Sequence, residues 1–328
     1  MVVLVDAEFW AGVDLGATWV RVVLSDEKGN FVDKISERVD LSSSDAMSKQ
    51  ISRLVKFLSR RQGFDFSSLK GVGVASAGPL IQGKGVLVSP PNLPFDYVPL
   101  TKPISKELHI RACLVNDCVG AVLGEHTFGA AKGLDNHVYI TLSTGIGGGA
   151  IVNGTLLLGK DGNGHEIGHL VIDCEGRLIC GCGKRGHWEA YCSGRNIPNF
   201  VRLRLKDLPA KEFAKSLLFN KIGGDLSKLD TKDLFSAAKE GDDLSRKLID
   251  EIGVLNAMGF ASVINVYDPS LITVGGAVAL KNKQTILGSI KRHVEDYTVN
   301  RVPKIMATPL GEEVVLYGAV AVALRYLS

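Results

Sequence analysis

The sequence predicts an α/β protein made of two related halves that face each other across a cleft. Two stretches, beginning at Ala11 and Val138, share one layout of three strands separated by two short polar or glycine-rich turns. Helical patterns with apolar residues three to four positions apart lie around them, over 45–62, 244–267 and 314–327. No Pro- or Ser-rich linker longer than a turn is present, so we expect packed elements to join the halves.

Each element follows from its own residues. We expect strands at residues 1–9, 19–24, 138–142, 150–152 and 271–274. Asn153-Gly154 is a strong hairpin signal, and glycines at 253 and 259 permit close packing of the helix over 244–267. We expect a smaller N-terminal α/β domain at 1–117, completed by a C-terminal helix at about 312–328, and a larger α/β domain at 118–311.

Charge and composition exclude several classes of protein. The chain has 38 basic and 35 acidic residues, so its net charge is +3, and it lacks the basic stripe of a nucleic-acid-binding protein. The longest apolar run, 314–324, has eleven residues, whereas a membrane span needs ~18. Four of the six cysteines lie within 174–192, which favours a metal or thiol site in a reducing cytosol. We expect a cytoplasmic protein without a nucleic-acid or membrane partner.

Glycine is enriched in the middle of the chain, where 18 of the 37 glycines lie between Gly120 and Gly194. Ser143–Gly149 offers backbone N–H groups without side chains, which suits phosphate oxygens. Asp14–Thr18 and Gly275-Gly276-Ala277 also follow apolar strands, as phosphate and nucleoside turns do. Each turn alone could equally be a plain hairpin, and it is their combination that predicts a nucleotide site.

Three familiar motifs fit the spacing of this region but not its context. Residues 145–150 match a dinucleotide fingerprint, but a strand follows instead of a helix. Residues 154–160 have P-loop spacing, but Asp161 occupies the Ser/Thr position. His165-Glu166-x-x-His169 matches the zinc-protease signature, yet four of the ten residues 159–168 are glycine, so the required helix is not expected.

A second interpretation of the histidines gives a closed metal site. His169, Cys180, Cys182 and His187 form a complete tetrahedral set for structural zinc. Gly183 and Gly186 turn the chain back from the cysteines to His187. Four protein ligands leave no open position, so this Zn²⁺ would not be catalytic. The alternative is two buried thiols beside unrelated histidines.

Together these segments resemble the ROK family of sugar kinases and repressors, within the hexokinase–actin (ribonuclease H-like) superfold. The resemblance covers essentially the whole chain. The family segment E-x-G-H followed by C-x-C-G-x-x-G-C-x-E is similar to Glu166–His169 and Cys180–Glu189, with His187 where the family usually has Cys. The resemblance implies an α/β two-domain fold with a cleft between the domains and a zinc-binding loop.

The resemblance also implies a set of site residues. It marks Asn116-Asp117 as the catalytic pair, and its sugar-binding residues match Asn92, Asn116, Asp117, Glu166, His169 and Glu189. Its nucleotide-binding turns match Asp14, Gly16, Ala17, Thr18, Ser143, Thr144, Gly145, Gly147, Gly275 and Gly276. The implied cofactors are ATP, structural Zn²⁺ and Mg²⁺, with Asp14 binding Mg²⁺ through water. A homodimer or higher homo-oligomer is also implied.

Asp117 can be argued from its chemistry as well. Phosphoryl transfer needs a base for the attacking hydroxyl's proton, and Asp117 follows the apolar run 112–115, where a strand would present it. The alternative is a helix N-cap for residues 118–125. We predict an ATP-dependent kinase that phosphorylates O6 of a hexose, with glucose as the first candidate substrate. The alternatives are an N-acetylmannosamine kinase and a non-catalytic sugar sensor. A repressor needs a helix-turn-helix ahead of the sugar domain, and Asp14 comes too early for one.

Overall fold

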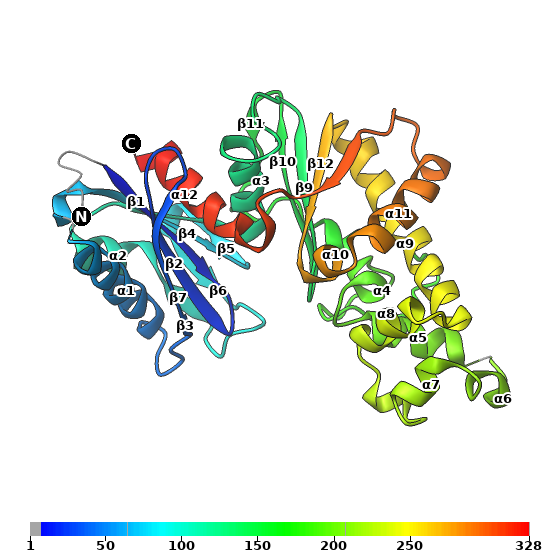
Figure 1. Cartoon of the computed structure of the whole chain (residues 1–328). Helices are drawn as coiled ribbons and strands as arrows, with labels where there is room; N and C mark the ends of the chain where they lie inside the picture. The colour runs from blue at the N-terminus through cyan, green and yellow to red at the C-terminus, as the bar shows by residue number, and fades with distance from the viewer. Residues whose placement is uncertain (1–7, 64, 207, 328) are drawn as a thin grey trace. The chain divides into compact units, whose positions relative to one another are not determined.

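The chain divides into two compact units, described in a computed structural model over residues 8–63, 65–206 and 208–327. Unit 1 comprises Met1–Tyr139, Gly149–His165 and Thr308–Ser328, and unit 2 comprises Ile140–Gly148 and Glu166–Ala307. Each unit combines strands and helices (Figure 1), so the predicted α/β class is confirmed. The strand predicted over 1–9 falls mostly on residues 1–7, which lie outside the described residues, and the first described strand begins at Phe9.

Unit 1 contains a five-stranded sheet with the strand order β3-β2-β1-β4-β8. These strands are β1 (Phe9–Leu15), β2 (Trp19–Ser25), β3 (Phe31–Arg38), β4 (Leu69–Ser76) and β8 (Ala112–Asn116). β1, β2 and β3 pair antiparallel, whereas β4 pairs parallel with β1 and with β8. Leu15 lies beside Ser76, and Ser76 beside Asn116, so the carboxyl ends of three parallel strands meet at one edge.

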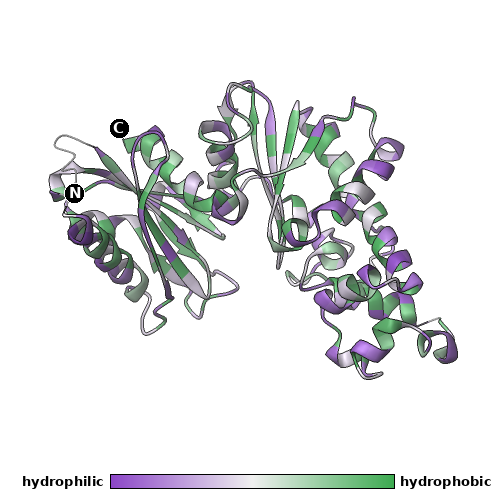
Figure 2. Ribbon diagram, in the orientation of Figure 1, coloured by the Kyte–Doolittle hydropathy of each residue, from purple (hydrophilic) through white to green (hydrophobic). Residues whose placement is uncertain are grey.

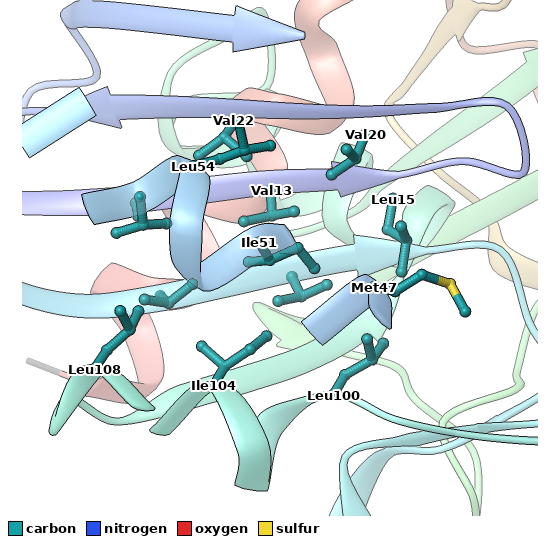
Figure 3. Packing of buried hydrophobic residues seen from close by; sticks show 14 of the residues in the cluster. Val13, Leu15, Val20, Val22, Met47, Ile51, Leu54, Leu100, Ile104 and Leu108 are labelled. Carbon is teal, nitrogen blue, oxygen red and sulfur yellow. The ribbon is translucent and has the colours of Figure 1, made fainter. Parts of the chain in front are cut away.

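Helices cover both faces of this sheet because successive residues of a strand point to opposite faces. They are α1 (Ala46–Gln62), α2 (Thr101–Leu108) and α12 (Val314–Leu327). Ile51 of α1 and Ile104 of α2 belong to the same buried cluster as Val13 of β1, on one face (Figure 3). On the other face, α12 packs against Trp10 and Val23. The helices expected at 45–62 and 314–327 are confirmed.

A second five-stranded sheet has the order β11-β10-β9-β12-β13. Its strands are β9 (His137–Leu142), β10 (Ile146–Val152), β11 (Thr155–Leu156), β12 (Leu271–Gly275) and β13 (Lys304–Ala307). The β10–β11 hairpin turns at Asn153 and Gly154, which both have positive φ, 49° and 70°, as a type I′ turn requires. A third, small sheet orders β5 (Leu80–Ile81), β6 (Val86–Val88) and β7 (Tyr97–Pro99).

The remaining helices are mostly in unit 2, apart from α3 (Asp117–Thr127) in unit 1. They are α4 (Glu189–Cys192), α5 (Ile197–Leu205), α6 (Ala210–Phe213), α7 (Leu217–Lys221), α8 (Thr231–Lys239), α9 (Asp243–Tyr267), α10 (Ala277–Lys281) and α11 (Lys283–His293). Short 3₁₀ turns lie at Phe66–Ser68, Gln82–Lys84, Ile167–His169, Leu226–Lys228, Val294–Tyr297 and Gly311–Glu313. Hydrophobic residues follow the strands of both sheets, while the outer face of α1 is hydrophilic (Figure 2).

The long helix α9 confirms the pattern predicted at 244–267 and is a core helix of unit 2. Its length and apolar composition alone would allow it to cross a membrane, but 56% of that stretch is buried inside the structure. A Cβ at Gly253 would lie 1.7 Å from Ser289 Oγ, and one at Gly259 2.4 Å from the Trp188 ring. Both glycines therefore allow the close packing that the sequence predicts.

Glycines also let α3 and α12 touch backbone to backbone in unit 1. A Cβ at Gly318 of α12 would lie 2.2 Å from the carbonyl carbon of Gly120, and one at Gly124 of α3 would lie 2.7 Å from the Gly318 nitrogen. This contact fixes α3, whose first residue is Asp117, against the C-terminal helix.

We predict that Gly318→Ala lowers the free energy of unfolding by about 1–3 kcal/mol, because backbone atoms cannot yield as a flexible side chain can. Urea denaturation followed by circular dichroism measures the change. Gly83→Ala is the matched control, since a Cβ there meets nothing within 4 Å and the residue is exposed. A Gly318→Ala protein as stable as wild type would contradict the described helix contact.

Candidate functional site

The carboxyl edge of the parallel strands in unit 1 brings together three predicted site residues. Asp14 is the penultimate residue of β1, Asn116 ends β8, and Asp117 begins α3. Because Leu15, Ser76 and Asn116 are consecutive register partners across the sheet, these residues lie at the same edge. This is where ligands bind in sheets of parallel strands.

Asp14 is paired with a residue that the sequence analysis missed, Arg21. The two are register partners in the β1–β2 pair, and Arg21 Nε donates to Asp14 Oδ2 at 2.8 Å. Arg21 also donates to the Glu312 carbonyl at 3.1 Å. Burial raises the pKa of Asp14, while the Arg21 charge lowers it. The antiparallel register was the signal that could have revealed Arg21, since it lies directly opposite Asp14.

The turn after Asp14 is tight and open to solvent. Gly16 donates its N–H to the Trp19 carbonyl at 3.0 Å, which closes the turn between β1 and β2. A Cβ at Gly16 would lie 3.2 Å from that carbonyl. Ala17 and Thr18 are exposed, and the Thr18 carbonyl accepts from the Val39 N–H at 3.0 Å.

Asn116, not Asp117, is the N-cap of α3. Asn116 Oδ1 accepts from the Cys118 N–H at 2.9 Å and from the Val119 N–H at 3.3 Å. The alternative N-cap role considered for Asp117 is therefore wrong. Asp117 is the first helical residue, half-buried, and its Oδ1 accepts from the Cys118 N–H at 2.8 Å. The positive end of the helix dipole stabilises a carboxylate at this position.

Two further asparagines lie in unit 1. Asn92 is exposed on the turn between β6 and β7. Asn163, which the sequence analysis missed, exchanges two hydrogen bonds with the Leu80 backbone, at 3.0 and 2.8 Å. A Cβ at Gly78 would lie 3.1 Å from Asn163 Oδ1 and 3.9 Å from Asn116 Nδ2, so Gly78 lies between these two amides. Asn163 sits in a glycine-rich segment without periodicity, and no sequence pattern marked it.

The glycine-rich turn predicted at 143–149 is shorter than expected. Only residues 143–145 form the turn, closed by Ser143 N–H donating to the Gly145 carbonyl at 2.9 Å, and Gly147 already belongs to β10. Gly149 has a different role, because a Cβ there would lie 2.4 Å from the Cys118 carbonyl of α3. The run therefore combines a turn with a helix-packing position.

The second predicted turn of unit 2 lies beside the first. Gly276 follows β12 with φ of 87°, and a Cβ there would lie 2.4 Å from the Leu142 carbonyl at the end of β9. Leu142 immediately precedes the 143–145 turn. The structure thus brings the turn at Gly275-Gly276 next to the turn at Ser143.

A cavity of about 630 Å³ opens at these two turns, within unit 2. Its volume lies in the ~300–1,000 Å³ range of small-molecule sites. Most of its lining residues were not predicted, because they come from α8, α10 and the segment after α4. The lining residues are Ser143, Thr144, Gly194, Arg195, Asp230, Thr231, Lys232, Phe235, Ser236, Lys239, Ala277, Val278, Lys281 and Asn282. Four of them are basic and one is acidic, which favours an anionic ligand.

The predicted sugar-binding residues Glu166 and His169 lie at the two ends of one 3₁₀ turn of unit 2, Glu166 as its N-cap and His169 as its last residue. His169 Nε2 lies 3.7 Å from Glu166 Oε2, and partial burial raises the pKa of Glu166. The short turn confirms that His165-Glu166-x-x-His169 is not the helix of a zinc protease. Glu189 is the first residue of α4. Its side chain is fixed by a hydrogen bond in which Oε2 accepts from the backbone N–H of Ile146 at 2.8 Å.

The four predicted metal ligands converge at one point of unit 2. The ligand atoms of His169, Cys180, Cys182 and His187 all lie within 4.8 Å of one another. His169 Nδ1 lies 3.1 Å from His187 Nδ1 and 3.8 Å from Cys180 Sγ, while Cys182 Sγ lies 3.3 Å from His187 Nδ1. Tetrahedral zinc bonds of about 2.0–2.3 Å imply ligand separations of about 3.3–3.8 Å. The residues therefore fit Zn²⁺, with His169 Nε2 left facing Glu166.

A buried carboxylate, Asp173, holds the chain that carries these ligands. Asp173 accepts from the Tyr191 hydroxyl at 2.5 Å, from Arg177 N and Nε at 3.1 Å each, and from Glu175 N at 3.3 Å. Burial alone would raise the pKa of Asp173, but the hydrogen bonds from Tyr191 and Arg177 lower it to about 2.

Known proteins resemble the chain over nearly its whole length. A glucokinase of Pyrobaculum calidifontis is 36% identical over 319 residues, covering 96% of this chain and 95% of that relative. A glucokinase of Aeropyrum pernix is 35% identical over 321 residues, 95% of this chain and 96% of the relative. Among solved structures, the chain matches a ROK family glucokinase from Streptomyces griseus in complex with glucose and AMPPNP. The TM-score is 0.78 at 27% identity, and the match covers 97% of this chain and 99% of that one.

The two sheets and the likeness to solved ROK kinase structures define a hexokinase-like α/β fold of two domains, the predicted fold class. The ROK family profile matches residues 10–326, so the chain belongs to the ROK family.

We predict that Asp173 stabilises the fold only where it is ionised. Its folded pKa of about 2 lies below the ordinary 3.8, so its contribution is complete above about pH 4 and is lost as the pH falls towards 2. Asp173→Asn should cost about 2–3 kcal/mol at pH 6, with a smaller difference from wild type at pH 2–3. Urea denaturation across this pH range checks it, with exposed Glu27→Gln as the control. A pH-independent difference would contradict the assignment.

Proposed function

We propose that the chain is an ATP-dependent glucokinase, which transfers the γ-phosphate of ATP to the 6-hydroxyl of glucose. One observation carries the proposal. The carboxylate of Asp117 stands at the N-terminus of α3, on the sheet edge that also carries Asp14 and its turn. The proposal is supported by the similarity of the chain to two glucokinases, which extends over nearly the full length of both relatives.

Asp117 acts as the general base in this proposal. Its half-buried carboxylate accepts the proton of the sugar 6-hydroxyl as that oxygen attacks the γ-phosphate. The Asn116 cap fixes the start of α3, and therefore the position of Asp117, through two backbone hydrogen bonds. The resemblance to the ROK family assigns sugar-binding roles to Asn92 and Asn116 of unit 1, and to Glu166, His169 and Glu189 of unit 2.

The nucleotide groups come from the turns. The 630 Å³ cavity receives the adenosine, with Ser143, Thr144 and the turn at Gly275-Gly276 beside it. The exposed turn residues Ala17 and Thr18 offer backbone N–H groups to phosphate oxygens, while the Gly16 N–H closes the turn on the Trp19 carbonyl. Asp14 would hold Mg²⁺ through water, and that ion neutralises phosphate charge when bound with ATP.

We predict that Asp117→Asn reduces glucose phosphorylation at least 1,000-fold while glucose still binds, because the amide keeps the shape but cannot accept the proton. A coupled assay of glucose 6-phosphate measures turnover, and calorimetry measures glucose binding. Wild-type turnover with N-acetylmannosamine in place of glucose serves as the substrate control. Near-wild-type turnover of Asp117→Asn would remove Asp117 from the role of base.

The same proposal includes one structural Zn²⁺ held by His169 Nδ1, His187 Nδ1 and the two thiolates of Cys180 and Cys182. Held by four protein ligands, the ion would serve a structural role: it would fix His169 directly, and Glu166 through the neighbouring His169 Nε2.

Metal analysis of the purified protein should find about one equivalent of zinc. Cys182→Ser should lose most of it and lower the melting temperature, because metal binding is coupled to folding of the loop. Cys174→Ser is the matched control, since Cys174 is an exposed thiol outside the four ligands. Less than about half an equivalent in wild type would contradict the zinc assignment.

A further inference from the structure

Both backbone groups of Ile146 contact residues near the predicted sugar and metal ligands. Its N–H donates to Glu189 Oε2 at 2.8 Å. Its carbonyl lies against Gly168, where a Cβ would approach to 2.2 Å. Ile146 is buried and directly follows the 143–145 turn. Glu189, to which a sugar-binding role is proposed, therefore bonds to the backbone of the first residue after the 143–145 turn.

The segment that follows Glu189 continues this attachment along the turn. Gly194 donates its N–H to the Ser143 carbonyl at 2.7 Å, and Arg195 donates to the Thr144 carbonyl at 3.3 Å. Thr231 Oγ1, from α8, donates in turn to the Gly194 carbonyl at 2.7 Å. Ser143, Thr144 and Ile146 are thus each hydrogen-bonded to the segment 189–195. Of these three hydrogen bonds, the one to Ile146 is made by a side chain, that of Glu189.

Glu189 also occupies the space beside Gly145. A Cβ at Gly145 would lie 2.6 Å from Glu189 Oε2, so the carboxylate fills the volume that a side chain on the turn would take. The other carboxylate oxygen lies 3.8 Å from Cys180 Sγ. A hydrogen bond from a backbone N–H to an ionised carboxylate is stronger than one between neutral groups. Glu189 thus packs against Gly145 of the turn and accepts a hydrogen bond from the residue that follows the turn.

We propose that Glu189 is a positioning residue for the 143–145 turn, so that ATP affinity depends on Glu189 even when no sugar is bound. The inference rests on the proposed function, because it takes the turn to be part of the ATP site. It differs from a role in sugar contact alone, which would leave nucleotide binding without sugar unchanged.

The test is calorimetric binding of Mg²⁺ and the non-hydrolysable analogue AMPPNP, without sugar, to the whole chain as purified, with its zinc content measured. Glu189→Ala should weaken binding about tenfold, because the Ile146 N–H loses its acceptor. Glu189→Gln should stay within about threefold of wild type, since an amide oxygen can still accept this hydrogen bond. Asn92→Ala is the matched control: it should raise the KM for glucose and leave AMPPNP binding unchanged.

A double-mutant cycle sharpens the test. Gly145→Ala should also weaken AMPPNP binding, by displacing Glu189, and adding it to Glu189→Ala should cost little more than Glu189→Ala alone. Wild-type AMPPNP affinity in Glu189→Ala, together with weakened glucose binding, would overturn the positioning role and leave the kinase assignment intact. A wild-type protein that phosphorylates no sugar and binds no AMPPNP would overturn the proposed function, and this inference with it.

Discussion

The parallel pairing of β1, β4 and β8 is the constraint on which the chemistry of unit 1 depends. A slip of one residue would turn every side chain of a strand to the other face. In the observed register, Leu15, Ser76 and Asn116 form one row, so Asp14 and Asp117 lie at the same edge although about 100 residues separate them. The glycine contact between α3 and α12 then fixes the helix that Asp117 begins.

In unit 2, the segment that carries the candidate metal ligands has little regular structure. Between Glu166 and Trp188 it contains one 3₁₀ turn and isolated bridges in place of longer strands or helices. Its shape depends on local anchors, which are the Asp173 hydrogen bonds, the converging metal ligands and the contacts at Ile146. Such a segment can place side chains of unrelated sequence position together, but loss of one anchor affects several of them.

The sequence predicted those parts of the molecule that periodicity, turn chemistry and ligand spacing determine. Helices α1, α9 and α12, the Asn153-Gly154 hairpin and the four clustered metal ligands are of this kind. It missed Arg21, Asn163 and the α8 wall of the cavity, because pairing across strands and the folding of loops decide those contacts. The alternative role weighed for Asp117, as N-cap of α3, belongs to Asn116 one residue earlier, since Asn and Asp are equally good caps.

Glycine shows where sequence reasoning reaches its limit. The run from 145 to 149 looks uniform in the sequence, yet Gly145 makes room for the Glu189 carboxylate and Gly149 for the backbone of α3. A Cβ would be too close to a neighbouring atom at both positions, 2.6 Å at Gly145 and 2.4 Å at Gly149. Composition therefore cannot distinguish the two glycines, which differ in the group that packs against them. At Gly145 the neighbour is a charged side chain on a turn, whereas at Gly149 it is the backbone of a helix packed on a strand. The same residue type therefore makes room for a side chain at one position and for a helix backbone four residues later.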